Sequence, residues 1–329
     1  HPLPPAVRIQ RLGSRRGLSS MQPLRRIGRL RRILAADRPD VLVSLLTKIN
    51  AIALAATIGT GIPVIACERN NPERQDAHPA WNAALVFLYQ RAAAIICQTR
   101  GSIRCLPRSM RTRALVIPNP IVAYPSMGGQ QPSSRLVAVG RLTRQKGYDL
   151  LIEAFARISS DHPSWSLDIW GDGEDRAALQ DRIDRLGLGN RVTLRGLSAT
   201  PGGWLEEASA LVLSSRYEGF PNVLGEAMAA GLPVVATACD FGPAELIDHG
   251  RTGLLAAPDD IESLAAALDR LMADDALRAR LGAAARAAMT RYAPDKILAR
   301  WDIAFAEVCP RPRSALSPDC HLPAAPDRR

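Results

Sequence analysis

The sequence predicts an α/β protein built from two doubly wound parallel sheets. Its 329 residues exceed what one hydrophobic core of ordinary size accommodates. Short apolar runs alternate with helical stretches, a pattern typical of parallel strands joined by helices. The alternation stops in residues 121–134, rich in Pro, Gly, Ser and Gln, and then restarts. We therefore expect two domains that face each other across a linker.

The first predicted domain covers residues 1–120. A basic amphipathic helix is expected from Met21, because Leu24, Ile27, Leu30 and Leu34 recur near helical spacing with arginines between them. The pattern then predicts strands at 40–46, 63–67 and 94–98, helices at 51–58 and 79–94, and a final extended segment at 116–120.

The second predicted domain covers residues 135–308 and has the alternation of a Rossmann-like fold. The expected strands, each followed by a helical stretch, are 136–140, 166–171, 191–196, 210–215, 233–237 and 253–256. One long helical region is expected at 261–292 and another helix at 296–308. The Pro-rich residues 309–329 are expected to be a disordered tail.

Charge is unevenly spread along the chain. Residues 1–50 hold eleven Lys or Arg against two Asp, a net +9 of the +10 of the whole chain. This asymmetry indicates an anionic partner, which a phospholipid surface, a lipid diphosphate or a nucleic acid would provide. No nucleic-acid partner is expected, because the basic segment lacks interleaved aromatic residues.

Other features limit the location and the cofactors. No stretch approaches the roughly 18 consecutive apolar residues of a membrane span, and the start lacks the regions of a signal peptide. The six cysteines form no C-x-x-C pair, which fits a reducing cytoplasm. No Asp-x-Asp pair is present, and neither a metal nor a cofactor is expected.

Two loops at predicted strand ends have residues suited to phosphate. In 140–147, GRLTRQKG, Gly140 ends a strand, and Arg141 and Lys146 precede a helix. A guanidinium and an ammonium there would grip a diphosphate, although a solvated basic loop has the same composition. In 171–174, GDGE, the glycines permit close backbone approach to a ligand, or form a plain turn.

A third loop, residues 218–226, places two carboxylates around a loop-to-helix junction. The backbone N–H groups of Asn222 and Val223 should be free at the helix start and would bind a phosphate or sugar oxygen. Glu218 would accept from sugar hydroxyls, and Glu226, expected in the first helical turn, from a ribose. The alternative is a surface charge at Glu218 and a helix-dipole partner at Glu226.

The run from Val137 to Asp259 resembles the group-one retaining glycosyltransferases of the GT-B fold. Their Glu-x7-Glu motif is written EGFPNVLGE and followed by AMAAGLPVVAT; GRLTRQKG and GPAELIDHGRTGLL match in order and spacing. The resemblance implies that Arg141 and Lys146 bind the donor diphosphate, that Glu218 addresses the sugar and that Glu226 holds the ribose. The implied donor-binding set is Gly140, Arg141, Lys146, Glu218, Pro221, Asn222, Val223 and Glu226, with Glu218, Arg141 and Lys146 acting in catalysis.

The first domain resembles, more loosely, members that extend polyprenyl-diphosphate-linked glycans in bacterial surface polysaccharide or glycoprotein assembly. The residues concerned are 44–50, the CERNNP run at 67–72 and IPNP at 117–120. By this resemblance Glu68, Arg69 and Asn70 are acceptor-side candidates, although the run would also suit a strand-end turn. Many relatives have a histidine there; this chain has none, and no catalytic histidine is assigned.

The resemblance implies transfer of a hexose or N-acetylhexosamine from a UDP-sugar to a glycan or lipid-linked acceptor at the inner face of the membrane. Retention would proceed by front-face displacement, with the leaving diphosphate helping to deprotonate the acceptor. Relatives begin with a strand, a glycine-rich loop and a helix that would precede the region where this chain starts, so the chain is expected to be truncated at its beginning and the first domain to be incomplete. Two alternatives stay open: a nucleotide-sugar-binding remnant without activity and a nucleotide-sugar epimerase.

Overall fold

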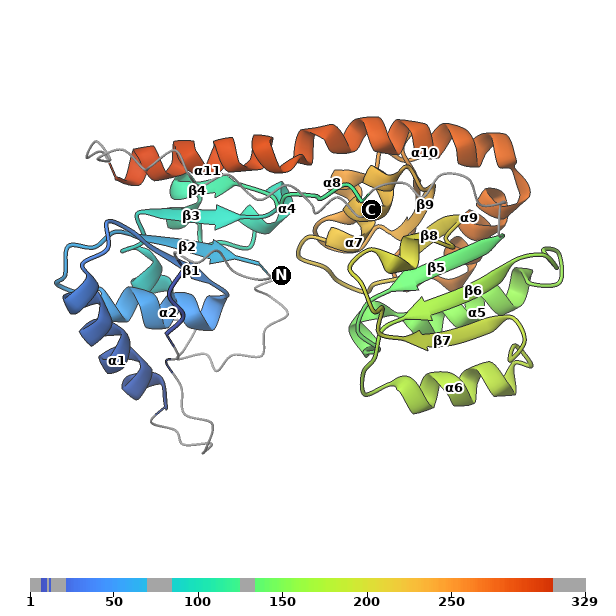
Figure 1. Ribbon diagram of the computed structural model, residues 1–329, viewed down its shortest axis with the longest axis horizontal. Helices are drawn as coiled ribbons and strands as arrows, with labels where there is room; N and C mark the ends of the chain where they lie inside the picture. The colour runs from blue at the N-terminus through green and yellow to red at the C-terminus, as the bar shows by residue number, and fades with distance from the viewer. Residues whose placement is uncertain (1–6, 11, 13–21, 70–84, 125–133, 310–329) are drawn as a thin grey trace, which may run out of the picture.

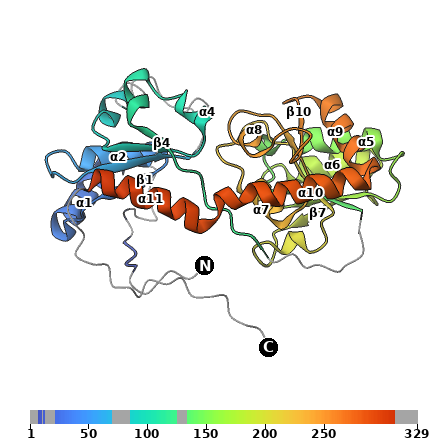
Figure 2. The same cartoon turned by 90° about the horizontal axis from the view of Figure 1, so that it is seen from above.

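The computed structural model describes residues 7–10, 12, 22–69, 85–124 and 134–309. Two α/β units lie side by side, each with its own parallel sheet, and helices α10 and α11 run along one side of both (Figures 1 and 2). The expected tail from 310 onward lies outside the described residues, as do 125–133 of the expected linker.

The first unit contains a four-stranded sheet in the order β1-β2-β3-β4, with every pair parallel. Its strands are β1 (Leu42–Leu45), β2 (Val64–Glu68), β3 (Ala94–Cys97) and β4 (Ala114–Val116). Its helices are α1 (Gln22–Asp37), α2 (Thr47–Ala56), α4 (Arg100–Ile103) and the 3₁₀ helix η2 (Arg108–Arg113). Residues 85–89 are also helical and form the described end of the helix expected at 79–94.

The basic helix α1 packs on α2, as its apolar spacing predicts in part. Leu34 is buried and Leu30 packs beside the core of this unit, whereas Leu24 is 65% exposed. Arg31 also holds the two helices together, since its Nη1 donates to the carbonyl oxygens of Ala56 and Ile58 at 3.2 and 2.6 Å. The C-terminal part of the apolar stripe of α1 therefore packs against the first unit, and its N-terminal end at Leu24 remains at the surface.

The second unit contains a six-stranded parallel sheet in the order β10-β9-β8-β5-β6-β7. Its strands are β5 (Arg135–Val139), β6 (Ser166–Trp170), β7 (Val192–Gly196), β8 (Ala210–Leu213), β9 (Val234–Thr237) and β10 (Leu254–Ala256). Its helices are α5 (Tyr148–Ile158), α6 (Arg176–Arg185), α7 (Asn222–Ala230), α8 (Pro243–Leu246), α9 (Ile261–Ala273) and α10 (Asp275–Met289). The short 3₁₀ helices are η3 (Arg144–Lys146), η4 (Gly203–Leu205) and η5 (Thr290–Tyr292).

The long helical region expected at 261–292 is interrupted, which corrects the sequence-based prediction. Asp274 leaves the helical conformation at φ −126° and ψ 101°, and its Oδ1 accepts from the backbone N–H of Leu277 at 2.8 Å. A side chain that caps a helix start in this way favours a break over continuation. Two helices, α9 and α10, result.

The last helix, α11 (Pro294–Val308), lies across the first sheet (Figures 1 and 2). Its buried residues Ile297 and Ala304 share one apolar cluster with Ile65 and Ile96 of the first sheet. The Sγ of Cys309 lies 3.3 Å from the carbonyl oxygen of Asp40. The same cluster contains residues of the second unit, such as Leu224 and Met289, so the buried side of α11 is in an apolar cluster that both units share.

The strand order of the second unit creates a switch point between β5 and β8. The chain leaves β5 towards β6 on one side and returns to β8 on the other side of β5. Ligands of open parallel sheets bind at the carboxyl ends of strands beside such a reversal. The loops after β5 and β8, residues 140–147 and 214–221, meet there.

Gly147 makes this meeting possible, and we expect Gly147→Ala to destabilise the protein. Its φ is +64°, and an added Cβ would lie 2.1 Å from the carbonyl oxygen of Ser214. Gly187 has a similar φ of +67° with nothing within 4 Å of an added Cβ, so Gly187→Ala is a matched control. The control should lose about 1–2 kcal/mol for the left-handed backbone alone.

Gly147→Ala should lose about 1–3 kcal/mol more, because the backbone of the second loop must move away. Urea unfolding followed by tryptophan fluorescence measures both losses. Equal losses in the two variants would show that the two loops are not packed as described.

Candidate functional site

Two predicted residues meet at the switch point. The Nζ of Lys146 lies 2.6 Å from Oε1 of Glu218, and the two side chains are 16% and 7% exposed. The hydroxyl of Ser215 donates to the same carboxylate oxygen at 2.7 Å. The structure thus brings together a cation and a carboxylate that lie 72 residues apart in the chain.

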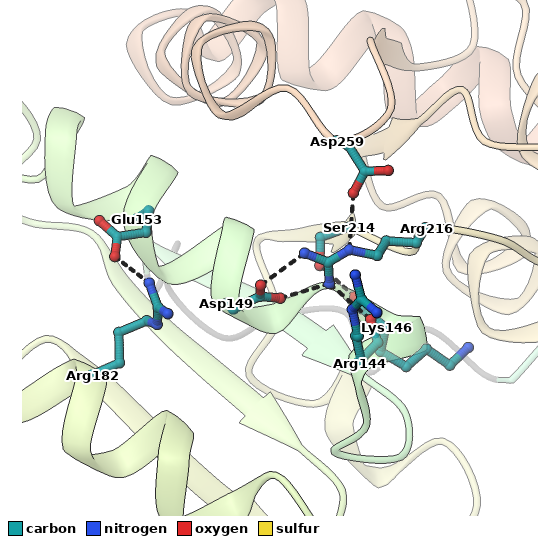
Figure 3. Close-up of polar contacts among 8 residues, drawn as sticks. All are labelled: Arg144, Lys146, Asp149, Glu153, Arg182, Ser214, Arg216 and Asp259. Carbon is teal, nitrogen blue, oxygen red and sulfur yellow. Dashed lines mark hydrogen bonds and ion pairs between the residues drawn. The ribbon is translucent and has the colours of Figure 1, made fainter.

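Arg216, which was not predicted as a site residue from the sequence, fixes the loop that carries Glu218. Its Nη1 and Nη2 donate to the two carboxylate oxygens of Asp149 at 2.8 and 2.7 Å, and its Nε lies 2.9 Å from Asp259 (Figure 3). Burial raises the pKa of Asp149, but the hydrogen bonds and charge of Arg216 outweigh it and hold the pKa below its usual value. A cation two residues before Glu218 was the only available sequence signal.

The backbones of the two loops are also joined directly. Nη1 of Arg216 donates to the carbonyl oxygen of Arg144 at 2.8 Å. The backbone N–H of Arg216 donates to the carbonyl oxygen of Gln145, also at 2.8 Å. The hydroxyl of Ser214 donates to the carbonyl oxygen of Lys146 at 2.8 Å. These contacts fix where Lys146 and Glu218 sit relative to each other before any ligand binds, which is the preorganisation that a charged site requires.

The other cation of the first loop, Arg141, is exposed, and its side chain has no hydrogen bond or ion pair among the described residues. It borders a pocket of about 160 Å³ between the carboxyl ends of β5, β6 and β7. The lining includes Gly140, Trp170 and Gly171 of the first two strand ends and Leu197 of the third. The second predicted loop, 171–174, therefore reaches the site through its first residues.

Helix α7 begins directly after the loop that carries Glu218, as the third loop predicts. Pro221 precedes it without a side-chain cap, and the N–H groups of Asn222 and Val223 have no partner among the described residues. Glu226 is the fifth residue of α7, and the first turn contains no acidic residue, so Glu226 lies further along than expected. Burial raises the pKa of Glu226, and no described side chain hydrogen-bonds to it.

The acceptor-side candidates have different surroundings. Glu68 is 3% exposed at the end of β2, and its carboxylate accepts from Thr47 at 2.7 Å, from Asn50 at 3.2 Å and from the Tyr89 hydroxyl. Burial raises the pKa of Glu68, and these hydrogen bonds oppose that rise. Glu68 thus supports the strand end from inside the first unit, whereas Asn70 lies outside the described residues.

Arg69 points the other way and reaches the second unit indirectly. Its Nη1 donates to Oδ1 of Asn119 at 2.6 Å, and Nδ2 of Asn119 donates to Oδ1 of Asn222 at 2.8 Å. An acceptor-side candidate and a donor-side candidate are therefore connected through one asparagine. Sequence spacing gave no means of finding this contact.

A second contact between the units involves Glu245 of α8. Its carboxylate accepts from the backbone N–H groups of Arg100 and Gly101, at 3.0 and 2.8 Å. The ring of Phe241 lies so close to Gly101 that an added Cβ would approach it to 2.7 Å. Carboxylates are favoured at a helix start, so this contact favours the observed juxtaposition of the units.

The described ranges contain no group of three or more His, Cys, Asp or Glu that could hold a metal ion. No disulfide joins the five cysteines within these ranges. None of the helices in these ranges has the length and apolar character needed to cross a bilayer.

Two family descriptions match the chain. "Glycosyl transferases group 1" matches residues 130–288, and "Glycosyl transferase 4-like domain" matches residues 2–120. An exopolysaccharide phosphotransferase of Streptomyces coelicolor is 40% identical over 69% of this chain and 24% of its own length. The amylovoran biosynthesis glycosyltransferase AmsD of Erwinia amylovora is 33% identical over 51% of this chain and 47% of its own. The chain spans less than two thirds of the length of these curated relatives.

Solved structures share the fold at lower identity. Anabaena HepE in complex with UDP and glucose has a TM-score of 0.77 and 22% identity, covering 89% of this chain and 84% of its own. Staphylococcus aureus TarM in a complex containing UDP has a TM-score of 0.73 and 20% identity, covering 85% of this chain and 59% of its own. These likenesses confirm the predicted GT-B fold. Two regions of the chain are thus similar to glycosyl transferases, residues 130–288 to the group 1 family and residues 2–120 to the 4-like domain.

Proposed function

We propose that this chain transfers a hexose or N-acetylhexosamine, with retention, from a UDP-sugar to a glycan or lipid-linked acceptor in polysaccharide synthesis. The observation that carries the proposal is the buried Lys146 and Glu218 pair at the switch point, beside the unpartnered start of α7. A diphosphate needs cations and N–H donors, and a sugar needs hydroxyl acceptors. Lys146 and the start of α7 would supply the first, and Glu218 would supply the second.

Each part of a UDP-sugar has a matching group in the second unit. Arg141 and Lys146 would bind the diphosphate together with the N–H groups at the start of α7. Glu226, which has no hydrogen-bonded side-chain partner in the described part of the chain, would accept from the ribose. The pocket of about 160 Å³ beside Arg141, with Trp170 on its wall, has room for a flat base.

The ion pair between Lys146 and Glu218 would make sugar recognition depend on prior binding of the diphosphate. In the unliganded site Lys146 and Glu218 satisfy each other. An incoming diphosphate competes for the Lys146 ammonium, which frees Glu218 to accept from sugar hydroxyls. In the bound state, the diphosphate would thus replace the Glu218 carboxylate as the ionic partner of Lys146.

In the proposed reaction the bond between the sugar C1 and the diphosphate oxygen breaks, and the acceptor oxygen bonds to C1 on the same face. The acceptor proton passes to an oxygen of the leaving diphosphate. Arg141, Lys146 and the α7 N-terminus stabilise the charge that develops on that group, and no metal is required. The remaining task of the protein is alignment.

The relatives support the polysaccharide context. AmsD carries amylovoran biosynthesis in its name, and LpsE of Rhizobium meliloti, 36% identical over 44% of this chain, carries lipopolysaccharide core biosynthesis. The HepE and TarM structures are complexes that contain UDP. These names favour a UDP-sugar donor and a glycan acceptor here.

We expect UDP to bind the second unit through Arg141, Lys146 and Glu226. Each alanine variant at these positions should weaken UDP about tenfold to a hundredfold, because a hydrogen bond to a charged group contributes about 1.5–3 kcal/mol. Titration calorimetry measures the three affinities. If all three variants bind UDP as tightly as the parent chain, the donor assignment is wrong.

Glu218→Gln should separate sugar recognition from nucleotide binding. UDP affinity should stay within about twofold or increase, because Lys146 loses its competing carboxylate partner. Acceptor-dependent release of UDP from a UDP-sugar should fall at least about tenfold, since Glu218 addresses the sugar. Glu226→Gln is the matched control and should weaken bare UDP instead.

The same assay tests the proposed reaction in the parent chain. Release of UDP that depends on acceptor supports transfer, whereas an isomerised sugar indicates an epimerase. Tight UDP binding without release indicates a binding protein that does not turn over. Loss of bare UDP binding in Glu218→Gln would contradict the proposed division between the two glutamates.

The charges of the two units favour a membrane-surface acceptor at the cytoplasmic face. Residues 22–69 and 85–124 hold fourteen Lys or Arg against three Asp or Glu, whereas 134–309 hold nineteen against twenty-five. The positive excess therefore belongs to the acceptor-side unit. An anionic leaflet would attract that unit and leave the donor-side unit facing away.

We expect the chain to sediment with anionic vesicles and not with neutral ones, and to dissociate as ionic strength rises. Each Lys or Arg near an acidic leaflet contributes about 1 kcal/mol, which salt screens. Replacing Arg25 and Arg29 of α1 by Gln should reduce sedimentation about tenfold or more. The same change at Arg185 and Arg270, which are exposed on the second unit, is the control. Equal binding to both vesicle types would favour an acceptor free in solution.

A further inference from the structure

A short chain of side-chain hydrogen bonds crosses from the first unit to the second. Oδ1 of Asn119 accepts from Nη1 of Arg69 and from Nε2 of Gln98, both at 2.6 Å. Nδ2 of the same asparagine donates to Oδ1 of Asn222 at 2.8 Å. Asn119 is thus held between the end of β2, the end of β3 and the start of α7.

Chemistry fixes which atoms donate and which accept in this series of hydrogen bonds. A guanidinium can only donate, so the atom of Asn119 that meets Arg69 must be the amide oxygen. The amide nitrogen of Asn119 must then face Asn222, and the atom that it meets there must be an oxygen. Arg69 therefore determines which way round the amide of Asn222 is held, across two intervening hydrogen bonds.

The orientation of the Asn222 amide matters because of the position of this residue in the fold. Asn222 is exposed and is the first residue of α7, next to the N–H groups that have no partner in the described part of the chain. With its Oδ1 facing Asn119, its Nδ2 is the atom left over. The helix start then presents backbone N–H groups and one amide N–H group of the same polarity.

We propose that Asn119 is a positioning residue that makes Asn222 an N–H donor to the diphosphate of the sugar nucleotide. The proposal rests on the proposed function for its ligand, while its hydrogen bonds belong to the unliganded chain. An Asn222 held the opposite way round would present its carbonyl oxygen to an anion. That would remove a donor and add repulsion.

Asn119→Asp tests the direction of the chain. The carboxylate still accepts from Arg69 and Gln98, but its second oxygen can only accept, so Asn222 must turn its Nδ2 inward and its Oδ1 outward. UDP affinity, measured by calorimetry, should fall about tenfold to a hundredfold. An unchanged affinity would overturn the proposal.

The same change in an Asn222→Ala background controls for the added charge. No amide remains to be reversed there, so Asn119→Asp should alter UDP affinity less than about twofold. A loss as large as in the parent background would mean that the carboxylate acts by its own charge, and the proposal would fail. Glu245→Ala cuts the other contact between the units and should leave UDP affinity unchanged; a comparable loss there would assign the effect to pairing of the units.

A measurement without nucleotide keeps this inference separate from the proposed function. The chain has seven asparagines, so selective ¹⁵N labelling of asparagine gives few side-chain amide signals, and Asn119→Ala and Asn222→Ala assign the two of interest. The Asn119 amide protons should exchange slowly with solvent, and the Asn222→Ala change should abolish that protection. Fast exchange of the Asn119 amide protons in the parent protein would contradict the hydrogen bonds that connect Arg69, Asn119 and Asn222, even if UDP binds. Slow exchange together with failure to bind UDP would instead refute the proposed function.

Discussion

The contact between the loop after β5 and the loop after β8 is the constraint on which the rest of the site depends. Gly147 lets the two backbones touch at Ser214, and Arg216 joins them through Asp149 and Asp259. Without that clamp, Lys146 and Glu218 would be two separate surface charges. With it, they form a pair at the point where the strand order reverses. Little reorganisation is needed when a charged ligand arrives.

The relation between the two units depends on a different kind of contact. Apolar side chains of α11 and of the first sheet are buried in the same cluster as residues of the second sheet. Ile121, at the start of the linker, is 4% exposed and lies against Gly225 of α7. Asn119 and Glu245 add directional hydrogen bonds between the two units to this apolar packing. The start of α7 is thereby influenced by both units.

The division of charge gives each unit a separate role in the proposed reaction. The second unit is net acidic but carries two cations, Arg141 and Lys146, on the loop after β5, where the proposed diphosphate would bind. The first unit carries a positive excess without matching carboxylates, and its one described carboxylate at a strand end, Glu68, is buried and hydrogen-bonded. An anionic acceptor or surface would therefore meet the first unit, and the nucleotide the second.

Local patterns in the sequence were enough to predict the two parallel sheets, the strand positions and the loops that carry Lys146 and Glu218, because period, glycine placement and charge spacing are local properties. The break at Asp274 and the packing of α11 on the first sheet were not predicted, since capping and burial depend on which partner a helix meets. The same holds for Glu68, which sequence placed at the acceptor side and the fold buried beside Tyr89. Arg216, Asn119 and Glu245 were missed because each acts through residues far away in the chain. Only the tertiary structure brings those partners within hydrogen-bonding distance, and so only it decided how the site is held.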